Sequence, residues 1–92
     1  MSILIIAEHD NQNLSAATLN TVTAASDIGK EINVLVVGYN CSNVSKQCSQ
    51  IPNIKSILEA NSEEYKNFVA ENVSKLIIDL SKDYSHILAP SS

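Results

Sequence analysis

Glycine, cysteine and basic residues are scarce in this chain of 92 amino acids, and each shortage excludes a class of site. Its two glycines, Gly29 and Gly38, stand too far apart to form a G-x-G-x-x-G loop or a P-loop around a phosphate. Six Lys and Arg residues against ten Asp and Glu give a formal charge of −4, with no basic stripe for nucleic acid. We therefore expect no nucleic acid partner and no glycine-rich nucleotide site.

The two cysteines, Cys41 and Cys48, lie seven residues apart, which is the spacing of neither a C-x-x-C redox pair nor a zinc knuckle. On a helix they would share a face but lie about 10 Å apart, beyond the reach of a disulfide. No Lys, Arg or His adjoins Cys41 to lower its pKa. We expect reduced structural thiols.

Long apolar runs are absent as well. The longest is only a handful of residues, whereas a helix that spans a bilayer needs about 20, and the amino terminus lacks the pattern of a signal peptide. With 45% hydrophobic and 17% charged residues, we expect one small globular domain over residues 1–92, without membrane insertion. The missing presequence favours a bacterial cytoplasm, or the mitochondrial matrix for a processed eukaryotic chain.

Four apolar runs predict four strands, at Ile3–Ala7, Ile32–Val37, Ile54–Leu58 and Ser85–Ala89. The first two runs are continuous rather than alternating, which is typical of parallel strands covered by helices on both faces. Helical segments between the runs indicate right-handed βαβ units. We expect an α/β fold with a parallel sheet of about four strands in the order 3-2-1-4, the start of a doubly wound, Rossmann-like domain.

The first crossover helix follows Ser15, runs for about fourteen residues and stops before Gly29. Its small alanines would let it lie close to the sheet. We place its apolar face on the residues that recur at three- and four-residue steps, namely Ala16, Leu19, Val22 and Thr23.

Two further helices are expected. The segment Asn43–Gln50 is rich in Ser and Asn, which weakens a helix, and Pro52 stops it. The third helix is clearly amphipathic, with Ser62 as its cap and Glu63 and Glu64 in its first turn. The apolar face of this helix comprises Tyr65, Phe68, Val69, Val73, Leu76, Ile77 and Leu80.

The crevice beside the first and fourth strands is where such sheets collect ligands. Glu8, His9 and Asp10 are the only three adjoining ionisable residues there, but neighbouring side chains at a strand exit point in opposite directions. His86 starts the fourth strand and is too far away to complete a metal site, and Ser91 and Ser92 have no base beside them. We interpret the motif as a polar loop or partner contact and assign no catalytic, cofactor-binding or metal residue. The residues expected along the crevice are Glu8, His9, Asp10, Ala89, Pro90, Ser91 and Ser92.

Three segments carry a resemblance to a known family: Ala7-Glu8-His9-Asp10, the run ATLNTVTAA at residues 17–25, and YSHILAP at residues 84–90. Together they resemble the amino-terminal domain of the electron transfer flavoprotein alpha subunit, and the Ala-Thr-Leu-Asn-Thr portion is the most specific. The resemblance implies a fold similar to the nucleotide-binding domains of universal stress proteins and adenine nucleotide alpha hydrolases.

The resemblance also implies a function. In that family an alpha and a beta subunit form a heterodimer that passes electrons through FAD from flavin dehydrogenases to a quinone oxidoreductase or similar acceptor. The flavin lies mainly in a later, carboxyl-terminal domain, so FAD is implied for the intact protein and none for residues 1–92. The segment would be a scaffold and subunit-interface domain of an electron carrier, and not an enzyme.

A strand that ends at Ala89 with no helix after it indicates a fragment of a longer chain. Such a fragment would expose apolar surface, and we expect it to self-associate through open sheet edges. The alternatives are a natural four-strand domain and a small nucleotide-binding module of the universal-stress type.

Overall fold

The computed structural model describes residues 2–27, 31–65 and 70–89, with side chains omitted for 70–72. Some predictions concern residues outside these ranges, namely Gly29, Phe68, Val69, Pro90, Ser91 and Ser92. The elements in chain order are β1 (Ser2–Ile6), α1 (Ala16–Ser26), β2 (Glu31–Gly38), α2 (Ser42–Cys48), β3 (Ser56–Asn61), η1 (Glu63–Tyr65), α3 (Ala70–Ser81) and β4 (His86–Leu88).

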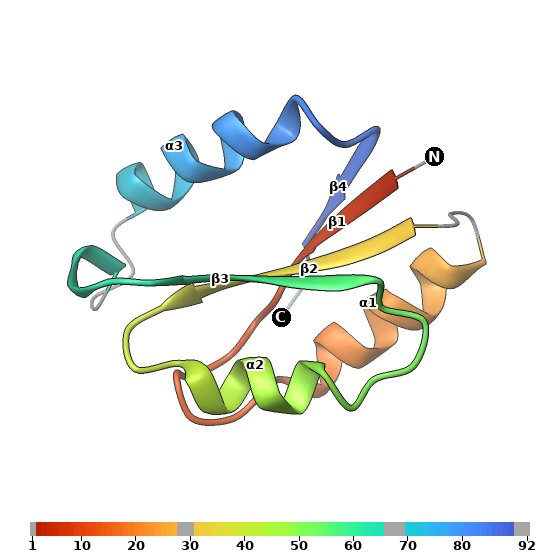
Figure 1. Ribbon diagram of the computed structural model, residues 1–92, viewed down its shortest axis with the longest axis horizontal. Helices are drawn as coiled ribbons and strands as arrows, with labels where there is room; N and C mark the ends of the chain where they lie inside the picture. The colour runs from red at the N-terminus through yellow and green to blue at the C-terminus, as the bar shows by residue number, and fades with distance from the viewer. Residues whose placement is uncertain (1, 28–30, 66–69, 90–92) are drawn as a thin grey trace.

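The four strands form one parallel sheet in the order β3-β2-β1-β4, which confirms the expected fold class and strand order. Pairs in register include Ile5 with Val34, Val34 with Ile57, and Ile3 with His86. Figure 1 shows α3 on one face of the sheet and α1 with α2 on the other. The sheet is therefore covered on both sides, as its continuous apolar strands require.

Alternate residues of the central strands feed two separate cores. One core lies under α1 and α2 and contains Ile3, Ile5, Val34 and Val36. The other lies under α3 and contains Leu4, Leu35 and Val37 at the intervening strand positions, together with Val73 of α3. Because β1 and β2 bury side chains on both faces, their sequences read as uninterrupted hydrophobic runs.

The expected face of α1 was wrong in three of its four positions. Ser15 caps the helix, accepting from Ala17 N at 3.2 Å, and Asp27 ends it after eleven residues. The buried residues are Thr18, Val22 and Ala25, whereas Ala16, Thr23 and Leu19 are exposed. A helix of Ala, Thr and Asn has almost no amphipathic pattern, so packing partners decide which side faces the sheet.

The second helix and the third strand are shifted from their expected bounds. α2 occupies Ser42–Cys48, slightly earlier than predicted, and the chain then turns through Pro52 and Asn53, the latter with a left-handed φ of 73°. β3 begins two residues later than predicted and extends to Asn61. Its connection to β2 starts earlier, since Lys55 N donates to Ile32 O at 2.7 Å.

The amphipathic third helix is confirmed over its described part. A short 3₁₀ turn, Glu63–Tyr65, precedes α3, and the main-chain carbonyl of Ser62 accepts from Tyr65 N at 3.0 Å. The predicted apolar residues whose side chains are described all pack on the α3 side of the sheet, namely Tyr65, Val73, Leu76, Ile77 and Leu80.

One buried amide joins three parts of this layer. Asn33 on β2 donates from Nδ2 to the Tyr84 hydroxyl at 3.1 Å and accepts at Oδ1 from Ser56 Oγ at 2.6 Å. Tyr84 lies between α3 and β4, and Ser56 begins β3. The satisfied amide thus attaches β2 both to the start of β3 and to the turn before β4, at the amino end of the sheet.

Candidate functional site at the strand exits

His9 is held on both ring nitrogens by main-chain groups. Its Nδ1 accepts from Asn11 N at 2.9 Å, so the proton of a neutral ring lies on Nε2, which donates to Val37 O at 2.8 Å. His9 therefore joins the loop after β1 to the end of β2. Neither ring nitrogen remains for a metal ion or a proton transfer while these bonds persist.

Asp10 shapes the same loop. Its Oδ1 accepts from Gln12 N at 3.0 Å and from Asn13 N at 2.7 Å, the arrangement of an Asx turn. These main-chain donors, that of Asn13 first, lower the pKa of the Asp10 carboxyl below its ordinary value of 3.8. Asp10 thus stabilises the geometry of the loop.

Gly38 permits the loop to approach β2 closely. A Cβ at this position would lie 2.9 Å from His9 Cε1 and 3.2 Å from Cys41 Cβ, and would collide with Asn11 Oδ1. Asn11 has a left-handed φ of 72°, and its Oδ1 accepts from Tyr39 N at 3.2 Å. Gly38 is the last residue of β2, and the close packing around it explains why a residue without a side chain stands there.

Side-chain amides of α2 complete the attachment of the loop. Asn43 Nδ2 donates to Gln12 O at 2.6 Å. Gln47 accepts from Leu14 N at 2.7 Å through Oε1 and donates from Nε2 to Asn13 Oδ1 at 3.2 Å. Asn11, Asn43 and Gln47 were not among the expected site residues. The one sign of them in the sequence is that Asn and Gln residues follow the ends of both β1 and β2.

Glu8 makes its contacts mainly through the backbone. Its N–H donates to Thr18 Oγ1 at 2.9 Å, and its carbonyl accepts from Ser15 N at 2.8 Å and from the Thr18 hydroxyl at 3.3 Å. Its Oε2 is buried and has no hydrogen-bond partner among the described residues. Glu8 therefore joins the end of β1 to the start of α1. It is also one of the residues that line the pocket beside it.

A shallow pocket of about 300 Å³ lies over this loop, lined by Glu8, His9, Asp10, Asn13, Leu14 and Ser15. The first three expected crevice residues thus share a pocket, and Ala89 is not among its lining residues. The lining contains two carboxylates and no Lys or Arg, so it does not fit the diphosphate of FAD or a nucleotide. Over residues 2–27, 31–65 and 70–89, no group of three metal-ligating side chains comes together.

The remaining candidates lie elsewhere. His86 pairs with Ile3 at the amino end of the sheet, so it is at the opposite end from His9, as expected. Cys41 and Cys48 are both buried in the core under α1 and α2, and burial raises the pKa of each thiol above 9.0. Both favour the neutral thiol, which agrees with a structural role.

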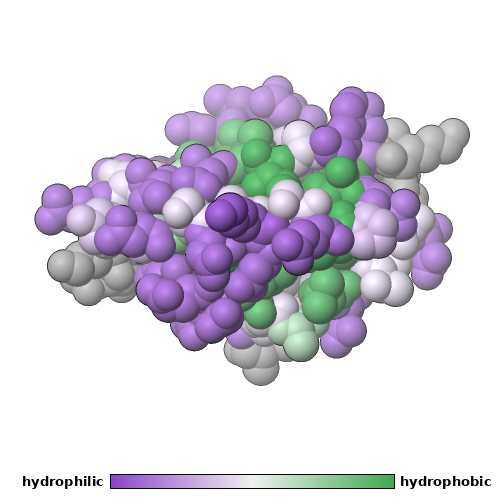
Figure 2. Space-filling model, turned by 60° about the horizontal axis from the view of Figure 1, so that its bottom comes forward, coloured by the Kyte–Doolittle hydropathy of each residue, from purple (hydrophilic) through white to green (hydrophobic). Residues whose placement is uncertain are grey.

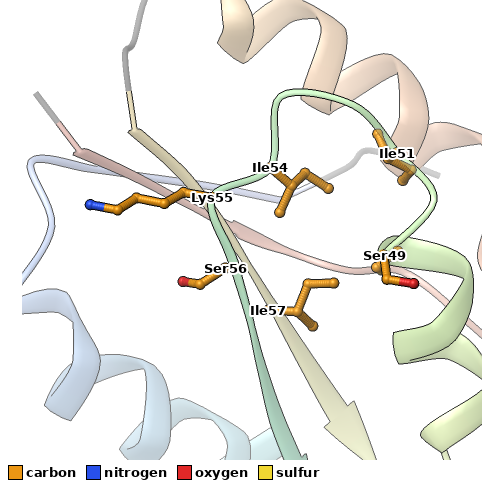
Figure 3. A pocket seen from close by; sticks show the side chains of 7 residues that line it. Ser49, Ile51, Ile54, Lys55, Ser56 and Ile57 are labelled. Carbon is orange, nitrogen blue, oxygen red and sulfur yellow. The ribbon is translucent and has the colours of Figure 1, made fainter.

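A second pocket, of about 280 Å³, lies at the amino end of β3. Figure 3 shows Ile51, Ile54 and Ile57 around it, while the Lys55 side chain extends away. Lys55 Nζ is bound to Glu31 Oε1 at 2.9 Å. The three isoleucines share the lining with Cys48, Ser49, Lys55 and Ser56.

Comparison with known proteins settles the family. The family model described as the electron transfer flavoprotein domain matches residues 3–92 of this chain. The chain belongs to the electron transfer flavoprotein family. This confirms the resemblance to the alpha subunit's amino-terminal domain, because the curated relatives are named as alpha subunits. Among the helices of the described residues, none has the length and apolar character needed to cross a bilayer.

The relatives of this electron transfer flavoprotein domain come from bacteria and eukaryotes. The alpha subunit of Pseudomonas aeruginosa is 47% identical over 92 residues, which is 100% of this chain and 30% of the relative. The probable mitochondrial alpha subunit of Caenorhabditis elegans is 39% identical over 84 residues, 91% of this chain and 25% of the relative. The mitochondrial alpha subunit of Dictyostelium discoideum is 35% identical over 97 residues, which is 97% of this chain and 27% of the relative. The chain thus spans less than a third of the length of these relatives.

Proposed function

We propose that this chain is a scaffold domain of an electron transfer flavoprotein alpha subunit, with no redox centre or catalysis of its own. The observation that carries the proposal is the family match over residues 3–92. The strand-exit loop supports it, because the side chains of His9 and Asp10 form hydrogen bonds with main-chain groups. These bonds stabilise the surface loop after β1.

The flavin belongs, in this proposal, to the remainder of a longer chain. The relatives are named as flavoproteins and are more than three times as long as this chain, which supports a domain at residues 1–92 followed by a separate FAD-binding domain. The acidic pocket over Glu8 and Asp10 argues against a dinucleotide at the strand exits. No residue of this chain is assigned to FAD.

The partners follow from the relatives' names. An alpha subunit implies a companion, and we propose the beta subunit, with flavin dehydrogenases as donors and a quinone oxidoreductase or similar protein as acceptor for the whole complex. Relatives from a bacterium and from mitochondria suggest the bacterial cytoplasm, or the mitochondrial matrix for a eukaryotic source. A universal-stress type nucleotide module is not favoured, since the matched relatives are alpha subunits.

Thermal unfolding of the chain with FAD, AMP and ATP tests the cofactor-free role. A ligand at 100 times its dissociation constant adds about 2.7 kcal/mol to stability, which a melting experiment detects readily. We expect no shift with any of the three. A shift with AMP or ATP would favour the nucleotide-binding alternative, and a shift with FAD would place flavin contacts in this domain.

Self-association of the isolated chain is expected from its sheet edge. β4 has only three residues, pairs with β1 on one side and leaves its other side free of strands among the described residues. An open edge is a template for strand pairing. Sedimentation equilibrium should show dimers or larger species as concentration rises, and a strict monomer at high concentration would contradict this expectation.

A further inference from the structure

The two hydrogen bonds of the His9 ring require one particular protonation state. Nδ1 accepts from Asn11 N at 2.9 Å, and Nε2 donates to Val37 O at 2.8 Å. A main-chain N–H can only donate and a carbonyl can only accept, so each bond assigns the role of one ring nitrogen. Of the three states of an imidazole, only the neutral ring with its proton on Nε2 forms both bonds.

A proton added at Nδ1 removes one of these bonds. The charged ring keeps its bond to Val37 O, but its new N–H points at the N–H of Asn11, and neither group can accept. The ring cannot move closer to β2, because a Cβ at Gly38 would lie only 2.9 Å from His9 Cε1. The loop, rather than the ring, is therefore the part that must move.

Asn11 connects this bond to a second contact with the end of β2. Its Oδ1 accepts from Tyr39 N at 3.2 Å. Its φ of 72° lies in the left-handed region, which costs energy in a residue other than glycine and persists only where neighbouring contacts support it. Loss of the acceptor for Asn11 N removes one such contact. One proton on His9 thus weakens both hydrogen bonds of Asn11.

Water reaches this part of the surface. His9 and Asn11 are partly buried, while Asp10, Gln12 and Asn13 are exposed. Figure 2, which brings the α1 and α2 side forward, shows hydrophilic residues over much of that side. Imidazole is the side chain that ordinarily changes its charge between about pH 5 and pH 8. A proton can therefore exchange between His9 and solvent in the physiological range.

The charge of Asp10 opposes this effect of protonation. Main-chain bonds from Asn13 and Gln12 lower the pKa of the Asp10 carboxyl most, and the charge of His9 lowers it further, so Asp10 attracts the charged ring. Asp10 itself titrates below pH 3.8, outside the range of imidazole. The titratable groups on the described elements around the ring are Glu8, Asp10, Tyr39, Cys41, Lys46 and Glu59.

We propose that His9 is a pH-sensitive latch, which holds the loop of residues 9–14 against β2 while its ring is neutral and releases the loop when Nδ1 takes up a proton from water. The closed loop accepts only the neutral ring, whereas the released loop accepts either state, so protons favour release. Closure is complete above the range in which imidazole titrates and is lost as the pH falls through it. The loop also lines the pocket of about 300 Å³ beside Glu8, so release changes the shape of that pocket. The inference concerns contacts within this chain and does not depend on the proposed function.

Hydrogen exchange of single amides, followed by NMR and corrected for the intrinsic effect of pH, tests the latch at about pH 7.5 and about pH 5.5, on either side of the usual imidazole titration. The chain has two histidines, and His86 lies at the opposite end of the sheet. His86→Gln is therefore the matched control, and it leaves His9 as the one histidine that can titrate. His9→Gln removes the titration itself, and circular dichroism checks that both variants fold.

Protection of the Asn11 and Tyr39 amides should fall at least about tenfold at the lower pH, in the unsubstituted chain and in His86→Gln alike, because their N–H groups lose their acceptors. In His9→Gln, protection should be the same at both pH values. The ¹⁵N shifts of the His9 ring, which need no variant, should place the proton on Nε2 at neutral pH.

Four results would overturn the latch. They are equal protection at both pH values in the unsubstituted chain, a fall that disappears in His86→Gln, a fall that persists in His9→Gln, and a proton on Nδ1 at neutral pH. The amides of Val34 and Leu35, in the buried strand β2, provide an internal reference. A fall of the same size at these two amides would mean that acid destabilises the whole sheet, and local release of the loop would then be wrong.

Discussion

At the scale of single residues, Gly38 sets how closely the β1 exit loop approaches β2. Gly38→Ala would place a methyl group against His9 Cε1 and Asn11 Oδ1, and His9 cannot retreat without losing its bonds to Val37 and Asn11. Such overpacking typically costs about 1–3 kcal/mol, which urea unfolding should reveal.

Asn11→Gly provides the control for this substitution. It removes the side chain that the new methyl would strike, and glycine suits the left-handed φ of 72° at this position. Gly38→Ala should therefore cost less in the Asn11→Gly background than in the unsubstituted chain. Equal costs in both backgrounds would mean that the collision does not govern stability.

Asp10 makes stability depend on pH in the acid range. Main-chain donors lower its folded pKa below 3.8, so folding favours the carboxylate and the unfolded chain binds more protons. The stabilisation is complete above pH 3.8 and is lost as the pH falls through the lower, folded pKa. Asp10→Ala should thus lower the urea midpoint at neutral pH, and the gap to the unsubstituted chain should close in strong acid.

Asp10→Asn is the matched control for the pH effect. Its amide oxygen can accept the same bonds from Gln12 N and Asn13 N but does not titrate in this range. The variant should keep most of the stability and lose Asp10's share of the acid dependence. A gap between Asp10→Ala and the unsubstituted chain that is the same at every pH would refute the assignment.

At the scale of elements, a buried hydroxyl attaches α1 to the segment that follows β1. Thr18 is fully buried, accepts from Glu8 N at 2.9 Å and donates to Glu8 O at 3.3 Å. Thr18→Val keeps the shape but leaves Glu8 N–H without this acceptor, at a cost of about 1–3 kcal/mol in unfolding free energy. Thr23→Val, exposed and bonded within its own helix, should change stability by less than about 0.5 kcal/mol. Similar losses for both variants would contradict this role.

The same hydroxyl explains why the sequence predicted the strands better than the first helix. β1 and β2 could be predicted because Ile, Leu and Val follow one another without a break. The order 3-2-1-4 was a guess that right-handed crossovers allow but do not determine. In α1, Thr18 is buried because its hydroxyl finds Glu8, while Leu19 remains exposed. Hydrophobicity alone would bury Leu19 and expose Thr18.

The strand-exit site was predictable in position and not in detail. Glu8, His9 and Asp10 could be placed at the exit of β1 because parallel strands gather their carboxyl ends at one edge. The partners of His9 come from Val37 and Asn11, and those of the loop from Asn43 and Gln47 on another element. Such pairings depend on loop conformation, which periodicity does not specify.

At the scale of the whole molecule, the two sides of the sheet differ in how deeply their helices are buried. Thr18, Val22 and Ala25 of α1 are almost inaccessible, whereas Leu76, Ile77 and Leu80 of α3 are only partly buried among the described residues. Regions with fewer buried apolar contacts open at lower free energy than the core. The α3 side should therefore open locally before the α1 and α2 side.

Native-state hydrogen exchange measures that difference in the chain itself. Amides of β1 and β2 should exchange most slowly, those of α1 somewhat faster, and those of α3 fastest of the three groups, because α3 can detach while Ile3, Ile5, Val34 and Val36 stay packed under α1 and α2. Exchange of α3 as slow as that of β2, in the free chain, would show that the sheet and all its helices unfold as one unit.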